Sequence, residues 1–135
     1  MQRNDVLVVA LGGRVLGVDA ISGEVIWSNE MELGGIAWVA LGVDESRVYS
    51  SASAKRIFCI DRATGNTLWD RPTSGLGRAT IICDESGISV CKSGLLDKFS
   101  IDGDLLWSTD LQQYGKGVAA LGLTGNVIQA DGRSK

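Results

Sequence analysis

The chain has 135 residues, of which 44% are hydrophobic, and its 13 basic and 16 acidic side chains leave a net charge of −3. This composition is typical of a globular protein and disfavours a basic surface for nucleic acid. No apolar run approaches the roughly 18 residues of a membrane span, and the first residues lack the features of a secretory signal. We therefore expect a soluble, cytoplasmic chain that binds neither nucleic acid nor membrane.

Short apolar runs rich in β-branched and aromatic residues follow one another from residue 6 onward, separated by Gly, Asp, Asn and Ser. This pattern predicts short antiparallel strands. No segment sustains apolar positions at helical spacing, so we expect no helix. Outside residues 78–115, which repeat the pattern of the unit before them, the predicted strands span residues 6–11, 14–19, 25–28, 36–43, 48–52, 56–61, 67–70, 118–123 and 126–130.

One short phrase recurs three times and ends each time on a tryptophan, with a glycine four residues earlier. The tryptophans are Trp27, Trp69 and Trp107, separated by 42 and 38 residues. The glycines are Gly23, Gly65 and Gly103. A period of about 40 residues indicates one supersecondary unit copied along the chain.

Four strands in each unit are typical of a blade of a β-propeller. We therefore predict an all-β fold of antiparallel four-stranded blades in a single repeat domain. The predicted units are an incomplete blade over 1–35, a second blade over 36–77, a third over 78–115 and the start of a fourth repeat over 116–135.

About three blades do not close a ring, because closed propellers typically have about four to eight. An open arc would expose apolar blade faces and unpaired strand edges. We expect closure by oligomerisation, with a dimer of six blades favoured and residues 116–135 pairing with the N-terminal blade of the second chain. The alternative is that the chain is a fragment of a larger propeller protein.

The recurring phrase resembles the tryptophan-docking motif of the pyrroloquinoline quinone (PQQ)-like propeller repeat, Ala-Leu-Asp-x-x-Thr-Gly-x-x-x-Trp. The second copy matches best, with Asp61, Thr64, Gly65 and Trp69. The first copy keeps Asp19, Gly23 and Trp27. The third is one residue shorter and carries Ser100 in place of the aspartate. The resemblance implies a propeller fold over nearly the whole chain.

The residue types of the phrase suit a structural role. An aspartate side chain can accept hydrogen bonds from nearby backbone N–H groups, and glycine supplies a left-handed conformation. Tryptophan brings a large apolar area and one N–H donor. We expect each tryptophan to lie between two blades, with its indole N–H bonded to a backbone carbonyl of the neighbour.

Catalytic and cofactor sites are not expected. The chain contains no histidine, and its three cysteines, Cys59, Cys83 and Cys91, are unclustered within apolar segments, as structural cysteines are. PQQ-dependent dehydrogenases, which the repeat resembles, need a longer chain, a calcium site and commonly adjacent cysteines, and none of these is visible. We predict neither an enzyme nor a bound cofactor or metal.

Binding residues are predicted in the loops that precede the innermost strands, over 29–35, 71–78 and 110–117. The sequences of these loops differ from repeat to repeat, whereas the strands around them follow one pattern. The first candidates are Arg78, Tyr114 and Lys116. Two function classes remain open: a non-catalytic scaffold or protein-interaction module, and a small-ligand binder that uses the central channel. Perturbed carboxylates beside a deep axial pocket would favour the second.

Overall fold

The structure is a computed structural model, and it describes residues 5–31, 39–51 and 55–128. All helical and strand structure in these residues is β-strand, which confirms the all-β prediction. The strands are β1 (Val6–Leu11), β2 (Arg14–Asp19), β3 (Val25–Asn29), β4 (Ala40–Val43), β5 (Arg47–Ser51), β6 (Arg56–Asp61), β7 (Thr67–Pro72), β8 (Ala79–Asp84), β9 (Gly87–Lys92), β10 (Leu95–Phe99), β11 (Leu105–Asp110), β12 (Leu121–Leu123) and β13 (Asn126–Ile128). Among the described residues, no helix is long and apolar enough to cross a membrane.

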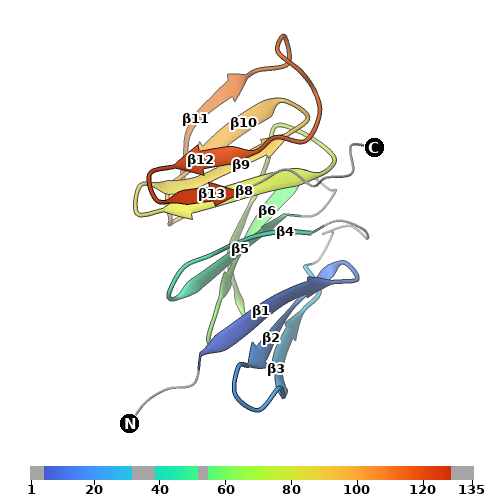
Figure 1. Ribbon diagram of the computed structural model, residues 1–135, viewed down its shortest axis with the longest axis vertical. Helices are drawn as coiled ribbons and strands as arrows, with labels where there is room; N and C mark the ends of the chain where they lie inside the picture. Colours follow the sequence, from blue (N-terminus) through green and yellow to red (C-terminus); the bar gives the residue numbers. More distant parts are fainter. Residues whose placement is uncertain (1–4, 32–38, 52–54, 129–135) are drawn as a thin grey trace.

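These strands pair with their neighbours in the chain and form antiparallel sheets. We call β1-β2-β3 blade 1, β4-β5-β6-β7 blade 2 and β8-β9-β10-β11 blade 3, while β12 and β13 form a separate hairpin. The three blades are stacked along the long axis of the molecule, with blade 1 at one end and blade 3 at the other (Figure 1). The arrangement is that of a partial propeller.

Blade 1 corresponds to the three outer strands of a complete blade. Its β2-β3 pair has the same register as β6-β7 of blade 2, because Trp27 lies opposite Gly17 as Trp69 lies opposite Cys59. The innermost strands β4 and β8 lie against each other, and β12 lies against β8 in the same way. The β12-β13 hairpin therefore has the place of the two inner strands of a further blade.

A β-bulge recurs in every blade beside the tryptophan strand. The register shifts after Gly17 in blade 1, after Cys59 in blade 2 and after Lys98 in blade 3. A bulge adds twist and redirects side chains. It precedes the turn that leads into the tryptophan strand, so all three turns leave their sheets in the same way.

The apolar core lies between consecutive blades rather than within one sheet. In β6, Phe58 and Ile60 pack toward blade 1, whereas Ile57 and Cys59 pack toward blade 3. All four are at most 4% exposed, because a middle blade has a neighbour on each face. This explains why the strand is an uninterrupted apolar run instead of an alternation.

Several predicted strand limits need correction. The strand predicted over 118–123 begins only at Leu121, because the chain before it does not pair with a neighbouring strand. There the carbonyl oxygen of Ala119 accepts a hydrogen bond of 2.6 Å from the Thr80 hydroxyl. Strands β3 and β7 run longer than predicted, and they include the first residues of the loops predicted over 29–35 and 71–78. Residues 36–38, 52 and 129–130 of the predicted strands lie outside the described residues.

Candidate functional site

The turn before each tryptophan strand is built by a side chain that binds the turn's own backbone. Asp19 Oδ1 accepts hydrogen bonds from the N–H groups of the second and third residues after it, at 2.8 and 3.1 Å. Asp61 Oδ1 does the same at 2.9 and 3.1 Å. In the third copy Ser100 Oγ accepts from Asp102 N at 3.3 Å and Asp104 N at 3.0 Å. The Ser100 hydroxyl therefore takes the place of the aspartate as the hydrogen-bond acceptor in the third turn.

The glycine of each phrase has the left-handed backbone that the turn requires, with φ of +80° at Gly23, +81° at Gly65 and +95° at Gly103. Each glycine N–H donates to the carbonyl oxygen of the capping residue that begins the turn, at 2.8 to 3.0 Å. The first two turns thus share one hydrogen-bond pattern over four residues, and the third closes over three, while the left-handed glycine stands four residues before the tryptophan in all three.

Trp27 lies between blades 1 and 2. Its Nε1 donates a hydrogen bond of 2.8 Å to the carbonyl oxygen of Arg62, the residue after the cap Asp61. A Cβ placed on Gly65 would lie 2.5 Å from ring carbons of Trp27, and one on Gly17 only 2.2 Å. The indole therefore fills the space between two glycines, and it is only 8% exposed.

Trp69 makes the same contact with blade 3. Its Nε1 donates to the carbonyl oxygen of Ile101 at 3.0 Å, and a Cβ on Gly103 would lie 2.9 Å from the ring. The Arg71 guanidinium lies 5.5 Å from the centroid of the ring, within cation–π range. Each of these two tryptophans thus binds the residue after the cap and covers the turn glycine of the next blade.

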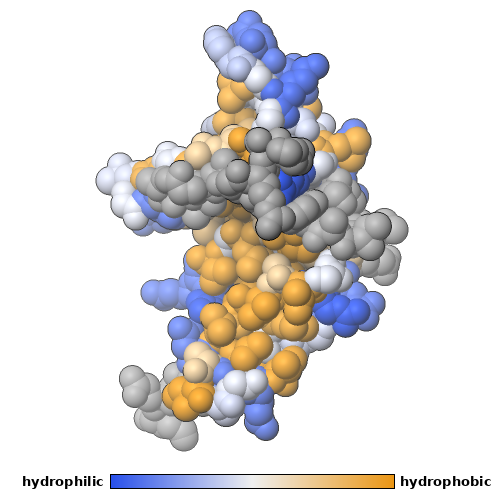
Figure 2. All heavy atoms as spheres, turned by 45° about the vertical axis from the view of Figure 1, so that its right-hand side comes forward, coloured by the Kyte–Doolittle hydropathy of each residue, from blue (hydrophilic) through white to orange (hydrophobic). Residues whose placement is uncertain are grey.

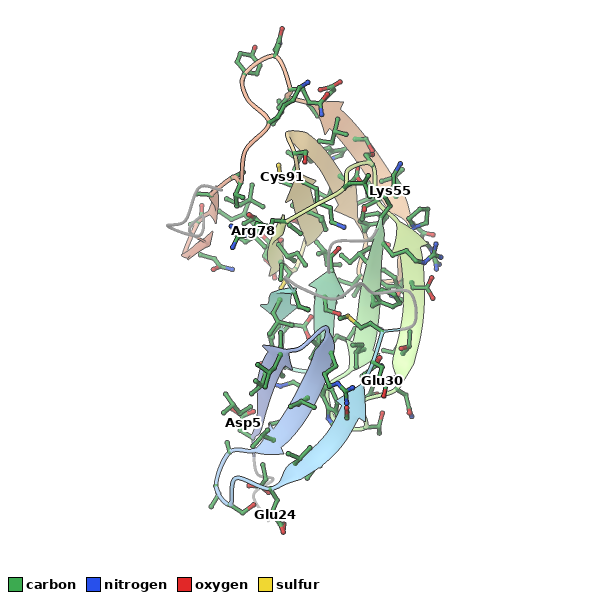
Figure 3. The ribbon with its side chains drawn as sticks, turned by 90° about the vertical axis from the view of Figure 1, so that its right-hand side faces the viewer. Asp5, Glu24, Glu30, Lys55, Arg78 and Cys91 are labelled. Carbon is green, nitrogen blue, oxygen red and sulfur yellow. The ribbon has the colours of Figure 1, made fainter. Side chains whose placement is uncertain are left out.

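Trp107, the third tryptophan, has no such partner in the part of the chain that the structure describes. It is 44% exposed, and all six residues of β11 are exposed. At the opposite end of the molecule, no heavy atom from the rest of the described residues lies within 4 Å of a Cβ placed on Gly23. Glu24 marks this turn at the free end of blade 1 (Figure 3). Among the described residues, one end of the molecule therefore carries a tryptophan without a partner turn, and the other end carries a turn without a partner tryptophan.

The predicted loop residues come from two different loops. Tyr114 and Lys116 are exposed in the connection between β11 and β12, with Tyr114 80% exposed. Arg78 is half-buried and lies directly before β8, in a different loop (Figure 3). Most of the loop predicted over 29–35 lies outside the described residues.

A groove of about 700 Å³ lies between blades 1 and 2 beside the turns. Its lining includes the carboxylates of Asp5, Asp19, Glu45 and Asp61, together with Arg62. The Arg62 guanidinium donates to Asp5 Oδ1 at 2.9 Å and to the carbonyl oxygens of Val6 and Asp44, each at 2.8 Å. It thereby ties β1 to blade 2, a role with no sequence signal. No group of three or more potential metal ligands occurs among the described residues.

The thiols and the buried lysine belong to the packing between strands. All three cysteines are free, and burial raises the pKa of Cys59 to about 12. Lys92 is 1% exposed, and burial lowers its pKa to about 8. The nearby Asp97 accepts hydrogen bonds of 2.6 to 2.7 Å from the N–H and hydroxyl of Ser74 and from the hydroxyl of Ser108. These contacts stabilise the packing of blade 3 against the segment that follows β7.

Comparison with known proteins gives one family match. Residues 11–132 match the PQQ_2 family model, which is described as outer membrane protein assembly factor BamB. No curated protein matches the sequence.

Solved structures with the same fold include BamB from Moraxella catarrhalis, with a TM-score of 0.66 and 15% identity over 92% of this chain and 37% of that one. The quinohemoprotein alcohol dehydrogenase from Comamonas testosteroni has a TM-score of 0.64 and 15% identity over 78% and 19%. The computationally designed Ika8 protein has a TM-score of 0.72 and 19% identity over 91% and 39%. The chain therefore spans less than half the length of each of these structures.

Proposed function

The chain belongs to the PQQ-like propeller-repeat family, and on that premise we propose that it is a non-catalytic propeller scaffold that binds protein through the open face of blade 1. The partner that we propose is a second copy of the chain, so that two arcs of three blades form a ring of six. The observation that carries this proposal is the apolar face that blade 1 leaves without a neighbour.

Equivalent positions in blades 1 and 2 indicate that no other blade among the described residues covers this face. The cross-strand pair Leu7–Val18 of blade 1 has the position that Val48–Ile60 has in blade 2. Both members of the second pair are 0% exposed, because blade 1 covers them, whereas Leu7 is 55% exposed. Apolar surface also gathers over the part of the molecule where blade 1 lies (Figure 2). Contiguous apolar surface of this kind marks protein interaction sites.

The titratable groups support a scaffold rather than an enzyme. The turn carboxylates Asp19 and Asp61 are engaged by backbone N–H groups. Burial raises the pKa of all three thiols, which suppresses the nucleophilic thiolate. Three free cysteines also fit a reducing compartment, and on that ground we propose a cytoplasmic location.

A small-ligand binder is the second candidate, and the groove between blades 1 and 2 favours it. Its volume of about 700 Å³ is in the range of ligand pockets, and its carboxylates would suit a cationic ligand. Against this candidate, its one arginine is already bound to three acceptors. A rise in melting temperature with PQQ and calcium, or with a polyamine, would favour this second candidate.

The proposed function is tested by replacing Leu7 with serine and measuring association by sedimentation velocity from low to high micromolar concentration. We expect the wild type to associate, and we expect the Leu7→Ser variant to be more monomeric at the same concentration. The matched control is Leu68→Ser in the middle blade, where Leu68 is 47% exposed despite two neighbouring blades. Association that is lost equally in both variants, or a wild type that stays monomeric, would contradict the proposal.

A further inference from the structure

We propose that two copies recognise each other head to tail through a tryptophan and a turn. The indole N–H of Trp107 in one copy donates to the carbonyl oxygen of Ala20 in the other, and its ring covers Gly23 of that copy. This inference rests on the proposed function, because it gives the open face of blade 1 a defined partner and orientation.

The two occupied interfaces within the chain define the contact. Trp27 bonds the carbonyl of Arg62 and covers Gly65, and Trp69 bonds the carbonyl of Ile101 and covers Gly103. In both cases the acceptor is the residue after the cap of the turn, and the covered glycine ends that turn. The corresponding acceptor in the first turn is the residue after Asp19, which is Ala20.

Trp107 has the same place in its blade as the two engaged tryptophans. It lies opposite Lys98 beside the bulge, as Trp69 lies opposite Cys59 and Trp27 opposite Gly17. Each of these tryptophans therefore points toward the blade that follows its own. Since Trp107 is 44% exposed against 8% for Trp27, about a third of its surface remains for a partner to cover.

The acceptor turn is already in the conformation that the contact needs. Asp19 holds the turn with hydrogen bonds of 2.8 and 3.1 Å, and the φ of +80° at Gly23 is within one degree of that at Gly65. Among the described residues, no backbone N–H in the turns and loops donates to the carbonyl oxygen of Ala20. The space above Gly23 is open where the other two turns hold an indole. A preformed turn lowers the ordering cost of binding.

The donor and its acceptor lie at opposite ends of the same chain, and this favours a second copy as the partner. The tryptophan strand β11 and the turn marked by Glu24 are separated by the whole stack of blades (Figures 1 and 3). A tail-to-head contact either extends into a filament or closes, and two arcs of three blades close after two such contacts. Each contact between the two copies then has the geometry of the Trp27 and Trp69 contacts within one chain.

The inner strands fit the same arrangement. Blade 1 holds only the outer three strands in the described residues, and β12 supplies an innermost strand at the other end of the chain. In the assembled blade, β12 of one copy would precede β1, β2 and β3 of the other. Because β13, which is paired with β12 in the structure, has the position that β1 of the second copy would take, the proposed arrangement requires β13 to separate from β12.

The closing experiment uses one variant at each end. Trp107→Ala removes the donor, and Gly23→Asn places a side chain where the ring would lie, since asparagine tolerates positive φ. The matched controls are Leu68→Ala, which removes an apolar side chain that is 47% exposed on the middle blade, and Gly12→Asn, at another open glycine with φ of +63°. Urea unfolding of every variant checks that the fold is kept.

We expect each end variant to weaken self-association about tenfold or more, the loss of about 1.4 kcal/mol, and both controls to associate like the wild type. Mixing Trp107→Ala with Gly23→Asn should restore part of the association, because one contact in the mixed pair is intact. Native mass spectrometry of chains of different mass detects that mixed pair. Trp107→Phe, which keeps a ring without the N–H, should fall between the wild type and Trp107→Ala.

Three outcomes would overturn the inference, and they are distinguishable from failure of the proposed function. If Leu7→Ser abolishes association while both end variants associate normally, the face binds protein but the tryptophan contact is wrong. If mixing restores nothing, or if the controls weaken association as much as the end variants, the head-to-tail contact is wrong as well. A monomeric wild type contradicts both proposals.

Discussion

The sharpest test of the blade packing compares the same substitution at two equivalent tryptophans. Trp27→Ala removes an indole that is 8% exposed and deletes the hydrogen bond of 2.8 Å to the Arg62 carbonyl. Replacing a buried tryptophan by alanine costs roughly 3–5 kcal/mol, which includes the cavity that remains. Trp107 buries little more than half of its surface, so Trp107→Ala should cost roughly 2 kcal/mol in the monomer.

The assay is urea unfolding followed by circular dichroism, at a concentration low enough that the chain is monomeric. The expected difference between the two variants is about 2 kcal/mol in the free energy of unfolding, with m-values close to that of the wild type. Trp27→Phe is the control that keeps a ring but removes the N–H donor, and it should lose less than Trp27→Ala. Equal losses at Trp27 and Trp107 would refute the assignment of one buried and one open tryptophan.

Three further predictions concern single buried sites. Gly65→Ala should destabilise the chain by more than about 1 kcal/mol, because its Cβ would lie 2.5 Å from the Trp27 ring at a φ of +81°, and thermal unfolding measures the loss. The pKa of Lys92 is lowered from its ordinary 10.5 to about 8, so the unfolded chain binds more protons between these values and this contribution to stability rises with pH there. Lys92→Met should remove that rise, which the difference in unfolding free energy between the two proteins isolates. Because its pKa is raised to about 12, Cys59 should react with Ellman's reagent at pH 8 only after unfolding.

The fold could be predicted because its signals are local. The apolar runs, the turn residues and the period of about 40 residues each constrain the chain within one unit, and the all-β propeller prediction is confirmed. The resemblance to the PQQ-like repeat is confirmed by the family match over residues 11–132. The third turn forms with Ser100 in place of the aspartate, because its hydroxyl also accepts two backbone hydrogen bonds, from the second and the fourth residue after it.

Features that depend on cross-strand register or on contacts between blades could not be predicted. The bulges after Gly17, Cys59 and Lys98 arise from cross-strand register, and nothing in these three residue types marks them. The hydrogen bonds by which Arg62 ties β1 to blade 2 include one to Asp5, which is 57 residues away in the chain. The strand predicted to begin at Val118 starts three residues later, at Leu121, because the residues before it do not pair with a neighbouring strand.

The open ends show why equal sequence positions do not have equal roles. Ile26, Leu68 and Leu106 precede the three tryptophans, and they are 49%, 47% and 51% exposed, although only Leu68 has blades on both sides. Their exposure belongs to the outer edge of every blade and says nothing about a partner. Leu7 and Trp107 are different, because Val48 and Trp27, their counterparts, are buried, and Trp69 is partly buried. An exposed apolar residue in a repeat protein indicates a binding surface only where its repeat-equivalents are covered, and this comparison selects the two ends of the stack.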